Sequence, residues 1–162
     1  MARIARKLVQ HFLNTTPAAE AATYAVLGHD LEEFSVEFNA DIEKTKNILG
    51  KNSISLKGYE KEASVEPYIA DPDDPVYTFL KGIIDEEKVL DDVKTDIVKV
   101  ELFGETTSGA YIATKEEAFI EIVSEGGDTT GYQIPFNIHF TGNRTAGTFN
   151  PTTKAFTPTI SA

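Results

Sequence analysis

The sequence contains no cysteine, no tryptophan and a single methionine among its 162 residues. Without cysteine the chain can form neither a disulfide framework nor a thiolate metal site. No run of apolar residues approaches the roughly 20 residues that a membrane-spanning helix needs. The basic N-terminal segment is interrupted by Gln10, His11 and Asn14, so we do not expect a signal peptide. These absences predict a protein that folds in a cytoplasm and has no membrane partner.

Basic residues are also scarce. The chain has 15 Lys and Arg against 26 Asp and Glu, which gives a formal net charge of -11. Because Arg3, Arg6 and Lys7 lie in the first nine residues, the rest of the chain has 12 basic against 26 acidic residues, a net charge of -14. Such a surface repels phosphate backbones, which argues against specific nucleic-acid binding through a basic patch. A like-charged wall would nevertheless let DNA move past without adhering to it.

The clearest pattern present is a strict alternation along residues 132–141. Apolar and polar residues take turns there, which is the signature of a strand with one buried face. The apolar set is Tyr132, Ile134, Phe136, Ile138 and Phe140, and the polar set is Gln133, Pro135, Asn137, His139 and Thr141. A strand at 118–124 and a glycine-rich turn at 125–131 complete a predicted hairpin, and a second reversal is expected at 141–143. The polar face is almost uncharged, so we expect it to cover or meet another surface.

A similar alternating strand is predicted from Glu33 to Ile42, and a single helix at residues 75–86. Asp73 or Asp74 can cap that helix, Pro75 suits its first position, and its apolar residues form one stripe. A polar excursion between Asp41 and Ala63, with a turn at Gly50, is longer than an ordinary hairpin connection. Shorter strands are predicted at residues 54–59, 63–69, 95–103, 109–114 and 145–150.

These elements predict an α+β fold that is mainly β and dominated by antiparallel sheet. We divide it into an N-terminal arm at 1–30, a β domain at 31–150 and an extended C-terminal tail at 151–162. The arm is interpreted as a segment that orders only against a neighbour. A pair of helices packed on the body is the alternative, because apolar residues recur at Ile4, Leu8, Val9, Phe12 and Leu13 before an alanine-rich stretch.

No set of residues in the sequence predicts catalysis. The histidines, His11, His29 and His139, are far apart, so we expect no metal site. Asp71, Asp73 and Asp74 lack the rest of a calcium loop and are explained by helix capping. The glycines of residues 125–131 precede a strand and have no lysine, unlike a phosphate loop. The paired carboxylates, including Glu116-Glu117, are interpreted as solvated surface. We therefore expect no enzyme activity and no cofactor.

Four segments carry a resemblance to a known family: residues 24–28 (YAVLG), 34–41 (FSVEFNAD), 44–50 (KTKNILG) and 126–144 (GGDTTGYQIPFNIHFTGNR). They resemble the tail tube proteins of phages, and the chain is similar to the major tail proteins of long-tailed phages and prophages of Gram-positive bacteria. The resemblance implies a β-sandwich or open barrel with one flanking helix, a long loop and extended termini. It also implies stacked hexameric rings whose strands join into one barrel around a DNA channel.

The same resemblance assigns roles to segments. Residues 75–86 would be the flanking helix, and residues 43–62 the ring-stacking loop, with Lys44, Asn47, Lys51, Asn52 and Lys57 as its contact residues. The partners would be other copies of the chain and other tail proteins (tape measure and tail terminator), with DNA passing through unbound. The protein would reside in the virion tail after assembly in the host cytoplasm.

The channel lining follows from the strand pattern rather than from the resemblance. The polar faces of the two alternating strands predict Glu33, Glu37, Asp41, Gln133, Asn137 and His139. Two alternatives remain open. One is the tube of a contractile tail or of a phage-derived bacteriocin. The other is a β-sandwich module that binds carbohydrate or protein through exposed aromatics, for which the candidates are Tyr59, Tyr68, Tyr111 and Tyr132.

Overall fold

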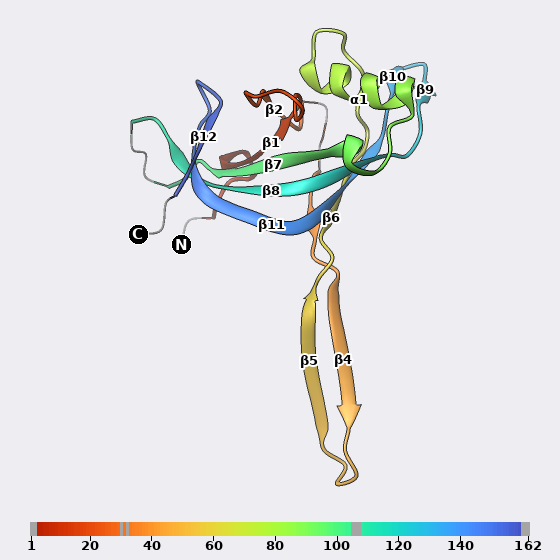
Figure 1. The fold of residues 1–162 in the computed structure, drawn as a ribbon, viewed down its shortest axis with the longest axis vertical. Helices are drawn as coiled ribbons and strands as arrows, with labels where there is room; N and C mark the ends of the chain where they lie inside the picture. The colour runs from red at the N-terminus through yellow and green to blue at the C-terminus, as the bar shows by residue number, and fades with distance from the viewer. Residues whose placement is uncertain (1–2, 30, 32, 105–107, 160–162) are drawn as a thin grey trace.

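The computed structural model describes residues 3–29, 31, 33–104 and 108–159. Over these residues the chain is mainly β with one α-helix, as the sequence predicts. An eight-stranded antiparallel sheet has the order β2-β1-β7-β8-β11-β6-β3, with β12 paired to β11 (Figure 1). Its strands are β1 (Val9–Asn14), β2 (Tyr24–Val26), β3 (Val36–Glu37), β6 (Glu62–Val65), β7 (Lys94–Glu101), β8 (Tyr111–Ile122), β11 (Phe136–Asn150) and β12 (Ala155–Pro158).

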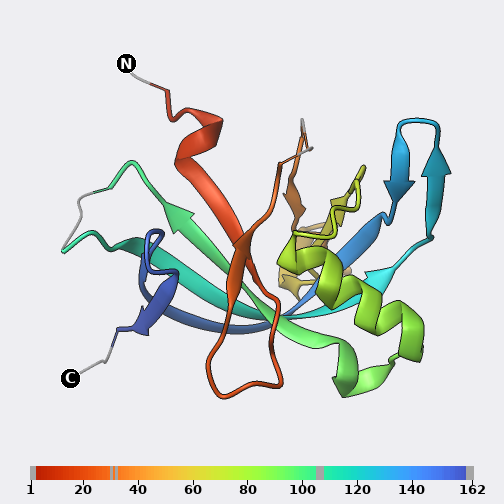
Figure 2. The ribbon, with the colours of Figure 1, turned by 90° about the horizontal axis from the view of Figure 1, so that it is seen from above.

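The sheet is covered on both faces, but at opposite ends. In β7 the neighbouring residues Ile97 and Val98 point to opposite faces, and both are buried. The face of Ile97 packs under helix α1 (Pro75–Glu86), whose Val76, Leu80 and Ile83 are buried. The opposite face holds a second core of Phe12, Tyr24, Val98, Val100, Ala113 and Phe149. Figure 2 shows α1 over one end of the sheet and β12 at the other.

The second core shows how strongly the sheet curls. Phe12 lies in β1 and Phe149 in β11, with β7 and β8 between them. Their ring centroids are nevertheless only 4.6 Å apart, and the Tyr24 ring lies 5.6 Å from Phe149. The right-handed twist of the strands therefore closes one end of the sheet around an aromatic cluster.

Helix α1 begins where the sequence predicts. The Asp74 carboxylate accepts a hydrogen bond from the main-chain N–H of Val76 at 3.0 Å, and Pro75 takes the first helical position. The Tyr68 hydroxyl donates to the other carboxylate oxygen of Asp74 at 2.8 Å. The helix ends at Glu87, which is in the left-handed conformation with φ of 48°.

The N-terminal segment is not an arm, which corrects the prediction. After a 3-10 turn at Arg6–Leu8, strand β1 pairs with β7 on one side and β2 on the other. Phe12 and Leu13 are both buried, one in each core. This arrangement breaks the alternation that reveals a strand with one solvated face, so spacing alone suggested a helix. The alanine-rich residues 18–23 form a turn, closed by the Thr15 N–H bond to the Thr23 carbonyl at 2.7 Å.

Strand β11 continues through residues 141–143, where a chain reversal was predicted. Phe140 pairs with Ala118 and Arg144 with Glu116, so residues 141–143 form a bulge against β8. Gly142 has φ of 89°, which only glycine adopts without strain. The Thr141 hydroxyl fastens the bulge by donating to the Glu117 carbonyl and accepting from the Asn143 N–H, each at 3.2 Å. The two strands predicted at 109–114 and 118–124 are accordingly one strand, β8.

Two further hairpins lie outside the main sheet. Strands β4 (Ala40–Lys46) and β5 (Asn52–Tyr59) form a hairpin that projects far from the body (Figure 1). The strand predicted from 33 to 42 breaks at Asn39, whose φ of 45° separates β3 from β4. Strands β9 (Gly126–Asp128) and β10 (Gly131–Gln133) form the second, short hairpin. The strand predicted at 132–141 is therefore divided at Ile134 and Pro135 between β10 and β11.

Candidate interaction surfaces

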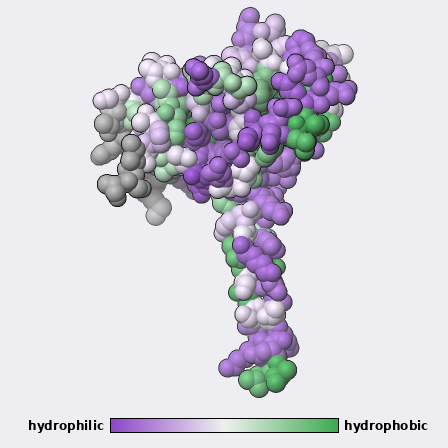
Figure 3. Space-filling view, viewed as in Figure 1, coloured by the Kyte–Doolittle hydropathy of each residue, from purple (hydrophilic) through white to green (hydrophobic). Residues whose placement is uncertain are grey.

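Several apolar side chains of the projecting hairpin are exposed to solvent. The register places Ile42 opposite Leu56 and Lys44 opposite Ile54, which puts these residues on one face. Ile42 is 49%, Ile54 67% and Leu56 51% exposed. The tip adds Ile48 and Leu49, which are fully and three-quarters exposed and appear as the apolar end of the hairpin in Figure 3. An isolated two-stranded hairpin is marginally stable in water, and exposed apolar side chains gathered on one element are typical of an interaction surface.

The tip is nevertheless well organised. The Asn47 side-chain oxygen accepts hydrogen bonds from the main-chain N–H groups of Leu49 at 2.9 Å and Lys51 at 3.0 Å. Gly50 supplies the positive φ of 81° that the turn requires. The backbone therefore holds Ile48 and Leu49 outward in a defined position.

The hairpin is basic, although the protein is acidic. It contains Lys44, Lys46, Lys51 and Lys57 against Asp41 and Glu43, a net charge of +2 on a chain whose total is -11. Lys57 forms an exposed ion pair with Glu43 at 2.5 Å. The five residues predicted for ring stacking, Lys44, Asn47, Lys51, Asn52 and Lys57, all lie in this hairpin and are all exposed. Residues 60–62 of the predicted loop do not belong to it, because Glu62 begins β6 in the main sheet.

Glutamates gather near the β3 edge of the sheet, on the face opposite to the one that α1 covers. Glu33, Glu37, Glu62 and Glu66 line a shallow depression of about 260 Å3 beside β3 and β6. In the register His139 pairs with Glu62 and Glu62 with Glu37, so these side chains share one face. We call this surface, including Asn137, the acidic face.

Polar contacts order the centre of the acidic face. The Ser64 hydroxyl donates to the Asn137 side-chain oxygen at 2.8 Å, and the Asn137 amide donates to the Glu121 carboxylate at 3.2 Å. His139 lies 2.7 Å from the same Glu121 oxygen. These bonds, from His139 first and then Asn137, hold the pKa of Glu121 below its usual value. Glu121 therefore remains ionised at neutral pH.

The predicted channel residues thus fall into two groups. The fold brings Glu33, Glu37, Asn137 and His139 onto the acidic face. Asp41 is opposite Gly58 in the projecting hairpin, and Gln133 is opposite Gly126 in the short one. The sequence could not separate them, because the breaks at Asn39 and Pro135 lie inside runs that alternate without interruption.

A pocket of about 310 Å3 opens on the helix-covered face, beyond the end of α1. Phe34, Phe38 and Phe140 form apolar walls, and Arg6, Lys61, Lys99 and Arg144 supply positive charge. We call this the basic-aromatic pocket. Lys61 Nζ lies 5.3 Å from the Phe38 ring centroid and 5.2 Å from that of Phe140, which is within cation–π range.

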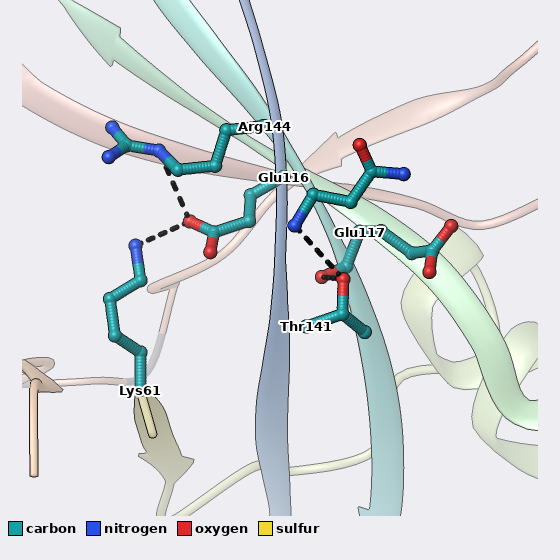
Figure 4. A network of polar contacts seen from close by, with 6 residues as sticks. Lys61, Glu116, Glu117, Thr141 and Arg144 are labelled. Atoms are coloured by element: carbon teal, nitrogen blue, oxygen red, sulfur yellow. Dashed lines mark hydrogen bonds and ion pairs between the residues drawn. The ribbon is translucent and has the colours of Figure 1, made fainter. Parts of the chain in front are cut away.

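Among the described residues Glu116 is the one acid lining this pocket, and it is 5% exposed. Its Oε1 is 2.5 Å from Lys61 Nζ and 3.8 Å from Arg144 Nε (Figure 4). Its Oε2 is buried and has no hydrogen-bond partner. The prediction of a solvated Glu116-Glu117 pair is therefore wrong for Glu116. The signal was available in the alternation, because Glu116 shares its face with the buried Ala118 and Ile120.

His11 lines the same pocket and stays uncharged at neutral pH. Burial, followed by the neighbouring charges of Arg6 and Lys99, lowers the pKa of His11 to about 4. Its ring packs edge-on against Phe34 with centroids 4.9 Å apart. His11 therefore belongs to the apolar wall rather than to the charged rim.

Replacing Lys61 with alanine should lower the free energy of unfolding by about 3 kcal/mol, because the buried Glu116 carboxylate loses its hydrogen-bonded partner and keeps only the more distant Arg144. The matched control is Lys57→Ala, which breaks an exposed ion pair and should cost less than about 1 kcal/mol. Urea unfolding followed by circular dichroism measures both. The double change Lys61→Met with Glu116→Leu should restore the stability. Equal, small effects of the two single variants would show that the buried pair contributes nothing.

Within the described residues no group of three His, Asp or Glu is placed to hold a metal ion. His11 lies in β1, His29 follows β2 and His139 lies in β11. None of the helical segments that the structure describes is long and apolar enough to cross a membrane.

Comparison of the chain with models of protein families found no match, and comparison with curated proteins found none either. What the protein does must therefore be inferred from its residues and their arrangement.

Proposed function

We propose that the protein is a self-assembling structural subunit, the tail tube protein of a long-tailed phage or prophage. Copies would form hexameric rings that stack into a hollow conduit for DNA. The observation that carries the proposal is the projecting hairpin β4–β5, an ordered apolar element that has no partner within the main sheet. Exposed apolar side chains gathered on one ordered element mark an interaction surface.

Charge supports another copy of the chain as the partner. The hairpin has a net charge of +2, and the rest of the chain is strongly acidic. Opposite charges on the two surfaces steer copies toward each other and disfavour contacts of hairpin with hairpin. The lysines of the hairpin would meet glutamates of a neighbouring body, while Ile54 and Leu56 lose their contact with water.

The acidic face fits a channel wall. Glu33 and Glu37 lie on it beside Asn137 and His139, and no lysine or arginine of the described part of the chain lines its depression. Repeated around a ring, these carboxylates repel the DNA backbone at short range, since the screening length at physiological salt is about 8 Å. In this proposal DNA passes without specific binding, and Asp41 and Gln133 take no part in the lining.

Electron microscopy of the purified protein at high concentration tests the proposal. Tubes, or rings with six-fold symmetry, are the expected result. A preparation that stays monomeric at every concentration, with its hairpin intact, would count against a tube subunit. Tubes surrounded by a contractile sheath in the source particle would instead assign the protein to a contractile tail or a bacteriocin.

A carbohydrate- or protein-binding module is less well supported. Such a module needs aromatic side chains gathered on one flat face. Tyr59 lies at the base of the projecting hairpin, Tyr132 lies in the short hairpin, and Tyr111 packs against the second core. Tyr68 packs against the core beside Phe136, with ring centroids 6.0 Å apart. The four candidate tyrosines therefore do not form a platform.

A further inference from the structure

The connection between α1 and β7 presents a small apolar knob with acidic flanks. Val89 is 63% and Leu90 81% exposed at its apex. Glu86 and Glu87 precede them, Asp91 and Asp92 follow, and Lys88 is the only base among them. We call residues 86–92 the acidic knob.

Main-chain hydrogen bonds order both ends of the acidic knob. The Lys88 N–H bonds to the Ile83 carbonyl at 3.1 Å, and the Asp92 N–H bonds to the Val89 carbonyl at 3.1 Å. Val93 packs against the core. Leu90 adopts φ of 56°, a left-handed conformation that is costly for leucine and that glycine would adopt freely. An exposed leucine in a strained position gives the monomer no benefit, which points to a partner.

The basic-aromatic pocket complements this knob in both apolar character and charge. Its phenylalanine walls suit two aliphatic side chains, and its volume of about 310 Å3 is at the low end of ligand pockets, roughly 300–1,000 Å3. Arg6, Lys99 and Arg144 bring positive charge to its rim, opposite in sign to the knob.

We propose that the acidic knob of one copy docks in the basic-aromatic pocket of a second copy. The two surfaces are different parts of the chain, so the contact is heterologous and repeats from copy to copy, closing into a ring or growing into a helix. The hairpin tip is a poorer occupant, because Lys46 and Lys51 flank Ile48 and Leu49 and carry the same charge as the pocket rim. The contact rests on the assembly proposed above and adds a second interface to it.

Cysteine cross-linking tests the contact directly, because the chain contains no cysteine of its own. Leu90→Cys places a thiol on the knob, and Thr114→Cys places one in the pocket wall. Under mild oxidation a mixture of the two variants should give disulfide-linked dimers on a denaturing gel. Each variant alone should give few, because a heterologous contact does not bring identical positions together. Leu90→Cys mixed with Ser55→Cys, on the polar face of the projecting hairpin, is the matched control.

A second variant separates docking from folding. Leu90→Gly removes the knob side chain and relieves its strained backbone, so the midpoint of thermal unfolding should not fall. Association measured by sedimentation should weaken at least tenfold. Val123→Ala, which trims another exposed apolar side chain, should leave association unchanged.

Dimers that form no more readily from knob and pocket thiols than from the control pair would overturn the contact, as would unchanged association of Leu90→Gly. These outcomes differ from failure of the proposed function. If tubes form but knob and pocket thiols do not cross-link, the tube proposal stands and the knob–pocket contact is wrong. If the thiols cross-link but neither tubes nor rings form, the contact stands and the tube proposal is wrong.

Discussion

A variant in which a two-residue Asn-Gly turn replaces residues 42–57 is expected to fold as a stable monomer that forms no tubes. Asp41 and Gly58 are already paired in the hairpin, so a tight turn can join them. The removed residues are exposed apart from their pairing with each other, so the cores lose nothing. Thermal unfolding should keep its midpoint, and electron microscopy at high concentration should show no tubes.

A double substitution in the hairpin measures how much its apolar face contributes to the affinity of association. Ile54→Ser with Leu56→Ser keeps the hairpin but removes two side chains that are now half or more exposed. Complete burial of such a side chain is worth about 1.5–3 kcal/mol, so covering the exposed part of both is worth about 3 kcal/mol. Because 1.4 kcal/mol corresponds to tenfold in affinity, association should weaken about 100-fold. Ser53→Ala with Ser55→Ala, on the polar face, is the control and should assemble normally. If the variant that lacks residues 42–57 still formed tubes, the hairpin would not be part of the assembly interface.

The other large effect is expected at the N-terminus. Leu13→Ala should lower the free energy of unfolding by about 3–5 kcal/mol, because Leu13 is fully buried in β1 between β2 and β7. A loss of this size is a large share of the 5–15 kcal/mol that typically stabilises a domain. Urea unfolding provides the measurement. The control is Ile4→Ala, which precedes the strand at a residue that is 59% exposed and should change stability by less than about 0.5 kcal/mol.

Strand β1 also determines the expected effect of an N-terminal truncation. Removing residues 1–20 deletes β1 and, with it, Phe12 from the aromatic cluster with Phe149. The truncated chain should be unfolded or aggregated rather than a competent monomer. A soluble, cooperatively folding product lacking residues 1–20 would mean that β1 adds little to the sheet.

The elements that the sequence predicted correctly have one environment along their length. Helix α1 has a clear cap at Asp74 and a single apolar stripe, and its boundaries follow from those two features. Over residues 136–140 of β11, before the bulge, the buried Phe136 and Ile138 alternate with Asn137 and His139, as the sequence pattern predicts. Such elements follow from local chemistry because only one of their faces is buried.

The elements that were missed change environment along their length or depend on distant partners. Strand β1 contributes to both cores, so Phe12 and Leu13 are buried side by side and the alternation is lost. The bulge at residues 141–143 is defined by pairing with β8, which no local pattern contains. Of the candidate surfaces, the sequence indicated the projecting hairpin and part of the acidic face. It did not indicate the basic-aromatic pocket, because the residues of the pocket come from six separate segments between Arg6 and Arg144.

The order of the strands has a consequence for the free subunit. The sheet ends in β2, of three residues, and β3, of two, while its longest strands lie inside. Short edges present few unpaired main-chain groups to a second copy, whereas β4 and β5 in the projecting hairpin have outer edges of seven and eight residues. In the part of the chain that the structure describes, the main sheet therefore offers few places for edge-to-edge pairing.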